Sequence, residues 1–241
     1  MVAVPEKLIR FAHLRWLVRI IQHPSAILLF VQLAGLLLYP FIEETRPARA
    51  VLGTFGILVL VLAILMVRHT PGRAWVSFCI AVPATVLNVI DMTLGAPQLR
   101  PWWAALEALF YFYAAGCLIS YMLEDRRATT DELFASGATF TLLAWGFTFV
   151  YVLCQALQPG CFTAALDPQE PRTWTELLFL SFALLSSTGI GDVIPVTVQT
   201  RAVAALEMFV GVMYIALVVS RLIGLTVSQQ RHEHKETSPH R

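Results

Sequence analysis

Long apolar segments alternate with short polar ones along most of the chain. A helix needs about 20 predominantly apolar residues to cross the roughly 30 Å hydrocarbon core of a bilayer. Six segments meet or approach this length, and we predict that each forms a transmembrane helix. They are residues 25–42, 51–67, 74–94, 102–123, 138–157 and 202–227.

A shorter apolar segment, residues 173–186, lies between the fifth and the sixth of these segments. It is too short to cross the bilayer as a helix, so we predict that it enters the membrane and turns back. Backbone of this kind is stable at membrane depth only where protein or a water-filled cavity covers it. The predicted fold class is therefore an all-α membrane protein with six transmembrane helices and one re-entrant helix.

Composition and charge agree with a membrane protein. Of the 241 residues, 57% are hydrophobic and only 14% are charged, whereas soluble domains carry about 25% charged residues. Lys and Arg are enriched in cytoplasmic loops, so their distribution predicts the orientation. With both termini in the cytoplasm, the outer side holds only five of the 17 basic residues, namely Arg46, Arg49, Arg100, Arg172 and Arg201. We therefore predict a multi-pass protein of the plasma or inner membrane with cytoplasmic N- and C-termini.

The polar segments divide the chain into five parts. Residues 1–24 form a basic N-terminal segment in the cytoplasm or at the membrane interface, and residues 25–123 hold four spans. Residues 124–137 form a cytoplasmic linker. Residues 138–227 hold the last two spans and the re-entrant segment, and the polar tail, residues 228–241, is predicted to be disordered.

The sequence SSTGIGD, residues 186–192, directly follows the re-entrant segment. Two glycines flanked by hydroxyls and an acid can cradle a phosphate, or they can expose backbone carbonyls to a cation. A phosphate loop needs a preceding strand and usually a Lys-Ser/Thr pair, and the sequence offers neither. Successive carbonyls that point the same way require backbone angles open mainly to glycine, and Gly189 and Gly191 supply glycine at alternate positions. The pattern therefore favours a cation site.

An outer helix, a short helix, a hydroxyl-x-G-x-G-D loop and an inner helix in this order resemble the pore module of potassium channels. The family's loop usually reads T-V-G-Y-G-D, and residues 187–192 read STGIGD. Pro195 after the loop and Gly211, about 20 residues beyond the second loop glycine, also match. The resemblance covers roughly residues 138–227. It implies a homotetramer in which four copies of this module surround one pore.

The resemblance also assigns roles to individual residues. It implies a pore helix at 173–186, a selectivity filter at 187–192 and an inner helix at 202–227. The implied ion-binding residues of the filter are Ser187, Thr188, Gly189, Ile190 and Gly191. Of these, the first four would bind dehydrated K⁺ through their carbonyls, with help from the Ser187 hydroxyl. The implied supports of the filter are Asp192, Phe179 and Leu180.

The implied function is passive, selective conduction of K⁺ through a tetrameric pore. K⁺ enters this function as the permeant ion, and no cofactor is predicted. The predicted partners are further copies of the chain and membrane lipids, without nucleic acid. We find no nucleophile–base pair, metal-ligand spacing or phosphate loop, so an enzyme is not predicted.

Ile190 departs from the family, which usually has tyrosine or phenylalanine at this position. The hydroxyl that ties the filter to the pore helices is therefore absent, and we expect an apolar contact between Ile190 and Leu180 instead. A weakly selective cation channel thus remains an alternative function. A regulatory membrane subunit that keeps the pore fold without conducting is a second alternative.

The inner helix carries a candidate gate. Gly211, Ile215, Val219 and Ile223 recur every four residues, and the family's geometry would turn this stripe toward the pore axis. A ring of branched aliphatic side chains can close a pore by dewetting. Gly211 is either a bend in the helix or a site of close helix packing, and the sequence leaves both open.

The fourth predicted span, residues 102–123, contains no Lys or Arg. A voltage sensor needs several positive charges along this span, so we do not expect it to sense voltage. Cys161, in the predicted outer loop, either stays free or forms a disulfide with Cys154 or across a subunit boundary.

Overall fold

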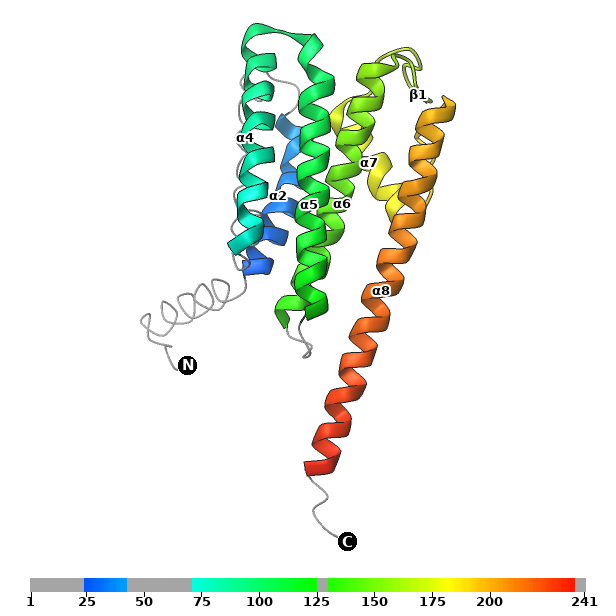
Figure 1. The fold of residues 1–241 in the computed structure, drawn as a ribbon. Helices are drawn as coiled ribbons and strands as arrows, with labels where there is room; N and C mark the ends of the chain where they lie inside the picture. The colour runs from blue at the N-terminus through cyan, green and yellow to red at the C-terminus, as the bar shows by residue number, and fades with distance from the viewer. Residues whose placement is uncertain (1–23, 43–70, 125–129, 237–241) are drawn as a thin grey trace, which may run out of the picture.

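The computed structural model describes residues 24–42, 71–124 and 130–236, which are mostly helical (Figure 1). The helices are α2 (Pro24–Ile42), α4 (Pro71–Leu94), α5 (Arg100–Glu124), α6 (Thr130–Leu157), α7 (Trp174–Leu185) and α8 (Val198–Glu236). A 3-10 turn, η1 (Pro97–Leu99), joins α4 to α5, and two short strands are β1 (Phe162–Ala164) and β2 (Val193–Pro195). The predicted span at 51–67 and the predicted N-terminal segment up to residue 23 lie outside the described residues.

Three helical segments are long and apolar enough to cross a membrane, by length and composition, among the residues that the structure describes. They are Pro97–Leu123, Asp131–Leu157 and Val198–Arg221. The spans predicted at 25–42 and 74–94 form α2 and α4, but their apolar helical parts, Ser25–Leu38 and Trp75–Asp91, are shorter. The structure therefore supports a mostly helical membrane protein with three candidate spans, and the number six remains a prediction.

Helix α6 lies at the centre of the arrangement (Figure 1). Its neighbours are α5 and α2 on one side and α7 and α8 on the other, while α4 packs against α5. Glycines allow the close contacts of α6: a Cβ at Gly146 would lie 3.0 Å from the Phe112 ring, and one at Gly137 would lie 3.0 Å from Leu29. Small residues at such crossings let membrane helices approach closely.

Aromatic side chains fill the space where α5, α6 and α7 meet. Tyr111 of α5 stacks on Phe149 of α6 with ring centroids 5.4 Å apart, and it also contacts Trp145 at 5.6 Å. Trp145 in turn meets Trp174, the first residue of α7, edge to face at 5.2 Å. Aromatic pairs in this geometry add attraction beyond their buried area. The cluster therefore holds the beginning of α7 against the helices before it.

The predicted cytoplasmic linker, residues 124–137, is shorter than expected. Helix α6 already begins at Thr130, and residues 125–129 lie outside the description. Asp131 and Glu132 occupy the first turn of α6, where acidic side chains favour a helix start because they face its positive dipole end. The Ser25 hydroxyl at the start of α2 donates to Asp131 at 2.8 Å.

The predicted disordered tail, residues 228–241, is helical as far as Glu236, because α8 continues from Val198 without interruption. The sequence VSQQRHEHKE contains neither glycine nor proline, and Gln, Arg, Glu and Lys have good helix propensities. The expectation of disorder rested on polarity alone, and polarity does not stop a helix that has already begun.

Two contacts join the middle of α8 to the start of α6. The Arg221 guanidinium forms an ion pair with Glu132 at 3.1 Å, and Glu132 is buried. One turn further along α6, the backbone oxygen of Ser136 accepts a hydrogen bond from the Tyr214 hydroxyl at 2.6 Å.

Strands β1 and β2 correct the all-α prediction. They pair antiparallel in the register Phe162 with Pro195 and Ala164 with Val193. Each strand has three residues, which is too short for an alternating apolar pattern to be visible in the sequence. The pairing fixes the loop after α6 to the segment that follows the glycines.

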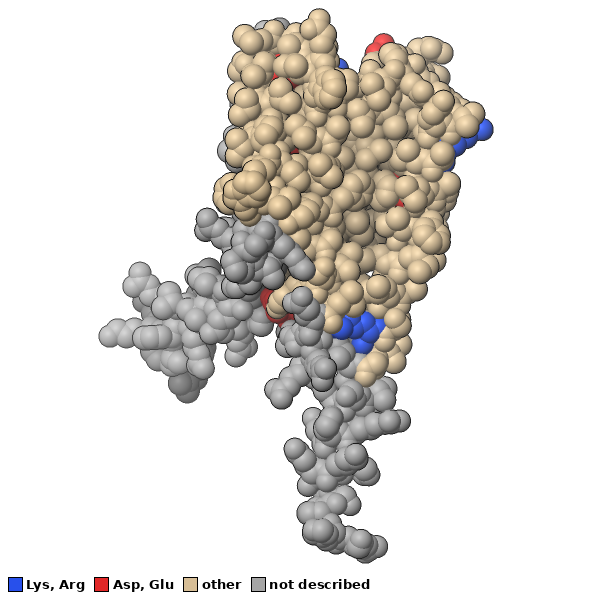
Figure 2. Space-filling model, viewed as in Figure 1, with Lys and Arg blue, Asp and Glu red and all other residues tan. Residues whose placement is uncertain are grey.

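Charged atoms on the face seen in Figure 2 gather toward its two ends. Between them lies a broad surface on which hardly any Lys, Arg, Asp or Glu atoms are visible, as expected for a surface against lipid or another apolar partner.

Candidate functional site

Helix α7 begins and ends at residues with defined capping roles. The Thr173 side chain accepts a hydrogen bond from the Glu176 backbone N–H, and the Glu176 carboxylate accepts one from the Thr173 N–H at 2.6 Å. This reciprocal capping box satisfies two of the unpaired amides at a helix start. The helix ends at Leu185 and Ser186 is its C-cap. The structure thus places a short helix at the predicted pore-helix position, 173–186.

The chain leaves α7 through a turn and continues as an exposed, irregular loop, residues 187–192. Ser187 and Gly189 have positive φ angles, 59° and 65°, while Gly191 does not. The left-handed region suits glycine but costs a residue with a Cβ about 1–2 kcal/mol. The special backbone therefore falls on Gly189 as expected, but its second position is Ser187 and not the second glycine.

The backbone N–H groups at the start of the loop form hydrogen bonds, whereas its carbonyls accept none from the described residues. The N–H of Ser187 donates to Leu184 O at 3.0 Å, and the N–H groups of Thr188 and Gly189 both donate to Ala183 O, at 3.0 and 3.1 Å. Within the described part of the chain, no hydrogen bond is accepted by the carbonyls of residues 187–190. A backbone carbonyl at membrane depth needs a partner. This segment therefore offers consecutive carbonyl oxygens that could coordinate a cation.

Hydroxyl groups bind the base of the loop to α7. Ser186 donates to Phe182 O at 2.6 Å, and Thr188 donates to Ala183 O at 3.1 Å. The two hydroxyl oxygens lie 3.0 Å apart. Thr188 thus points its hydroxyl back into the protein, and the exposed Ser187 is the hydroxyl residue left for a ligand.

The three predicted supports of the filter have different surroundings. Leu180 is 3% exposed and belongs to the chain's own core, whereas Phe179 is exposed and Ile190 is 55% exposed. Asp192 is exposed and forms no hydrogen bond or ion pair with the other described residues. In a single chain the side chain of Ile190 is therefore not enclosed, and its expected contact with Leu180 remains a prediction for an assembly.

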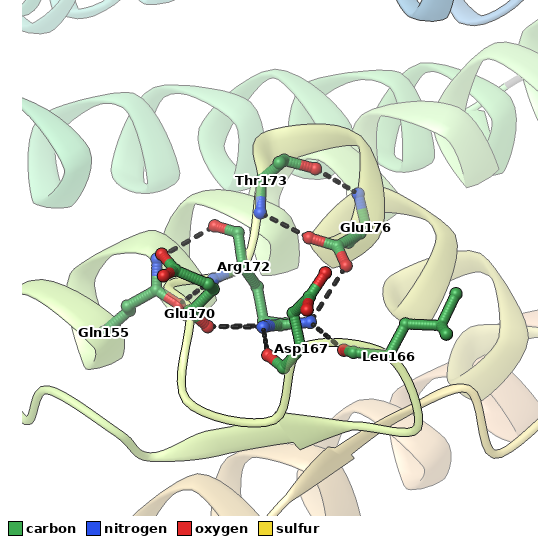
Figure 3. A network of polar contacts seen from close by, with 7 residues as sticks. All are labelled: Gln155, Leu166, Asp167, Glu170, Arg172, Thr173 and Glu176. Atoms are coloured by element: carbon green, nitrogen blue, oxygen red, sulfur yellow. Dashed lines mark hydrogen bonds and ion pairs between the residues drawn. The ribbon is translucent and has the colours of Figure 1, made fainter.

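Arg172, just before α7, organises the loop that connects α6 to α7 (Figure 3). Its side chain is buried, and its Nη1 donates to the Glu176 carboxylate at 3.1 Å and to Leu166 O at 3.3 Å. Its Nε donates to Glu170 O at 3.0 Å, and its Nη2 donates to the same oxygen and to Asp167 O. The planar guanidinium has five N–H donors, so one side chain can hold several loop carbonyls together.

The backbone of Arg172 is held as well as its side chain. The amide side chain of Gln155, near the end of α6, accepts from Arg172 N at 2.8 Å and donates to Arg172 O at 3.0 Å (Figure 3). The start of α7 is thereby fixed to α6. The T-x-x-E pattern at 173–176, which is typical of a helix start, could have marked the first residue of α7, although the prediction of this helix did not rest on it. The roles of Gln155 and Arg172 have no local signature.

Cys161 precedes β1 and is buried and free, and Cys154 is also free. Burial raises the pKa of the Cys161 thiol to about 11. The thiol therefore stays protonated near neutral pH, where thiolate chemistry is slow. Its backbone oxygen accepts from Val196 N at 2.9 Å, which extends the pairing of β1 with β2.

Helix α8 passes directly behind α7 at Gly211. A Cβ on this glycine would lie 2.0 Å from Leu185 O, so only glycine fits. The packing alternative for Gly211 thus has a structural basis, and α8 runs through this position without a break. The other members of the predicted gate, Ile215, Val219 and Ile223, are exposed on α8 in the single chain.

The sequence model of a protein family described as "Ion channel" matches residues 108–228, which is half of the chain. The match begins in α5 and includes α6, α7, the loop 187–192 and most of α8. Neither the comparison with curated proteins nor the comparison with solved structures finds a match.

Proposed function

We propose that this chain, which belongs to the ion channel family matched over residues 108–228, is one subunit of a tetrameric potassium channel. Membership of the family makes it an ion channel protein of a membrane, consistent with potassium channels. The choice of ion, the number of subunits and the ion-binding residues are the parts that we add.

The observation that carries the proposal is the uneven use of the loop's backbone groups. The N–H groups of residues 187–189 all donate into the end of α7, and the carbonyls of residues 187–190 receive no hydrogen bond within the described chain. A dehydrated K⁺ ion requires oxygens in place of its water shell, and rings of backbone carbonyls provide them. We assign the K⁺ sites to Ser187, Thr188, Gly189 and Ile190, with Gly191 completing the filter.

Four copies around one axis would cover what a single chain leaves exposed. Only 22% of the candidate span in α8 is buried within one chain, compared with 50% of the span in α6. Irregular backbone such as residues 187–192 is stable in a membrane only inside protein or against a water-filled cavity. An assembly in which α8 lines the axis and the loops face one another satisfies both requirements.

The exposed stripe of Ile215, Val219 and Ile223 suits the inner lining of such an assembly. We propose that these side chains form an apolar constriction on the side of the filter toward the C-terminus, where it can gate by dewetting. The excess of basic residues predicted on the side of both termini supports a position of this constriction at the cytoplasmic side of the inner or plasma membrane.

A weakly selective cation channel is the second candidate, and Ile190 is the observation that favours it. This side chain is 55% exposed and has no hydroxyl with which to hold the filter open at one diameter. Apolar contacts between Ile190 and neighbouring pore helices would fix the diameter of the filter less strictly than hydrogen bonds do.

The assignment of the filter is tested by two glycine substitutions with matched backbone strain. Gly189 and Gly95 have φ angles of 65° and 62°, and a Cβ at either position would meet no atom within 4 Å. Each change to alanine should therefore cost about 1–2 kcal/mol of folding free energy through strain alone. Only Gly189 lies in the proposed filter.

We expect purified protein in liposomes to carry a K⁺ flux down an imposed gradient. The Gly189→Ala protein should lose this flux, while the Gly95→Ala protein, at the same density, should keep it. Loss in both variants, or in neither, would contradict the assignment. No flux from the wild type would favour a non-conducting membrane subunit.

A further inference from the structure

A fully buried polar cluster lies where α6, α7 and α8 meet. Its members are Tyr151 of α6, Ser181 of α7 and Glu207 of α8, and each is 0% exposed within the single chain. The Tyr151 hydroxyl donates to Oε2 of Glu207, and the Ser181 hydroxyl oxygen is hydrogen-bonded to Oε1 of the same carboxyl group. Ser181 Oγ also lies 2.8 Å from the backbone oxygen of Ala144.

The hydrogens of this cluster can be counted. A serine hydroxyl carries one hydrogen, and a backbone carbonyl can only accept. The hydrogen between Ser181 and Ala144 must therefore come from Ser181. The hydrogen between Ser181 and Glu207 must then come from Glu207, which requires a protonated carboxyl group. If Glu207 were ionised, Ser181 would have one hydrogen for two contacts, and either its contact with Ala144 O or its contact with Glu207 Oε1 would contain no hydrogen.

The charges around Glu207 lead to the same protonation state. In the described part of the chain no ion pair includes Glu207, and the other charged side chains that the structure describes on α8 and α7 have partners elsewhere. Arg201 donates to Pro195 O, Arg221 pairs with Glu132, and Glu176 pairs with Arg172. From α6 the titratable groups nearby are Tyr151 and, beside it, Cys154. A buried carboxylate without a cation is costly, and neutralisation avoids that cost.

The cluster is close to the proposed filter along α7. Ser181 lies two residues before Ala183, whose carbonyl receives the amides of Thr188 and Gly189. On α8, Glu207 lies one turn before Gly211, which touches Leu185 at the end of α7. The hydrogen bond between Glu207 and Ser181 therefore fixes the part of α7 to which the backbone of the proposed filter is hydrogen-bonded.

We propose that Glu207 is a protonated carboxylic acid and a positioning residue for ion selectivity. It accepts from Tyr151 and donates to Ser181, and so holds the pore helix between the outer and inner helices. This inference rests on the proposed function for its selectivity part, whereas the protonation of Glu207 stands on the geometry of one chain.

Protonation is tested by infrared difference spectroscopy of the purified, full-length protein at pH 7.5, wild type against Glu207→Gln. Glutamine keeps both roles, because its carbonyl can accept from Tyr151 and its amide can donate to Ser181. We expect the difference spectrum to show the loss of a protonated carboxyl stretch. Loss of ionised carboxylate bands in its place would overturn the proposal. Other carboxyl groups cancel in the difference.

The positioning role is tested by selectivity. We expect Glu207→Gln to keep the wild-type ratio of K⁺ to Na⁺ permeability within about twofold and its midpoint of thermal unfolding within about 2 °C, whereas Glu207→Ala should lower that midpoint by about 5–10 °C. We expect Glu207→Ala to lose selectivity for K⁺ over Na⁺. The Ser181→Ala protein, which retains the carboxyl group, should lose it as well. Unchanged permeability ratios in both alanine variants would overturn the positioning role.

The two proposals can fail separately. If the wild-type protein passes no current, the proposed channel function fails, and the infrared spectrum still decides whether Glu207 is protonated. If current and selectivity are normal in every variant, the channel function stands and the role of Glu207 is refuted.

Discussion

Gly211 shows how one missing side chain sets the distance between two helices. A Cβ at this position would lie 2.0 Å from the oxygen and 2.8 Å from the carbon of the Leu185 carbonyl, and both atoms belong to backbone that cannot turn away. The end of α7, and with it the start of the exposed loop, therefore rests directly on α8.

Gly211→Ala should destabilise the protein by at least about 2 kcal/mol, because overpacking forces the two backbones apart. Gly224, also in α8, is the matched control, since a Cβ there would meet nothing within 4 Å. Gly224→Ala should leave stability unchanged or raise it slightly, as alanine favours helix. Thermal unfolding of both variants in detergent measures the difference. A Gly211→Ala protein with wild-type stability but altered channel opening would show that Gly211 is a bend.

At the scale of elements, the position of α7 depends on contacts at both of its ends. Its start is fixed by the capping box, by Trp174 against Trp145 and by the bonds of Arg172 and Gln155. Its end is fixed by Gly211 of α8 and by the hydroxyls of Ser186 and Thr188. These contacts fix the position of the short helix and therefore that of the exposed loop that follows it.

Arg172→Lys should lower stability by about 2 kcal/mol and weaken ion selectivity, because lysine cannot reach all four acceptors of the guanidinium and buried carbonyls lose their donors. Arg201→Lys is the control, since Arg201 is exposed and its Nε donates to one carbonyl, that of Pro195. A surface exchange of this kind should change stability by less than about 0.5 kcal/mol. Equal effects of the two exchanges on unfolding would contradict the role given to Arg172.

Elements with a local pattern could be predicted from the sequence, and contacts between distant elements could not. Apolar length indicated the helices at 25–42, 102–123 and 138–157, and the glycine pattern indicated the loop at 187–192. The ion pair of Arg221 with Glu132 joins residues 89 positions apart, and Tyr151 meets Glu207 across 56 positions. Such pairs depend on how helices pack, which no short window of sequence contains.

The ends of helices were also difficult to predict from the sequence. The segment 130–137 was predicted as linker and the tail 228–241 as disordered because both are polar, yet α6 begins at Thr130 and α8 continues to Glu236. Polarity indicates exposure to water, and a helix that extends past the membrane is also exposed to water.

At the scale of the whole molecule, α8 is the candidate span that the single chain covers least. Large apolar side chains of α8, such as Phe209, Val212 and Val219, are exposed, and only 22% of its candidate span is buried, compared with 44% in the span of α5 and 50% in that of α6. The loop 187–192 is exposed as well, and its carbonyls 187–190 accept no hydrogen bond from the described residues. A common axis for several copies would place both features at the centre of one pore, which is the basis of the tetramer that we propose.

The central claim is that residues 187–191 form a potassium-selective filter. The most direct measurement is the reversal potential of the purified protein in planar bilayers, with K⁺ on one side and Na⁺ on the other. We predict a reversal close to the K⁺ equilibrium potential, which would make Ile190 compatible with selectivity. A clear current that reverses near zero would contradict the claim and support a weakly selective cation channel.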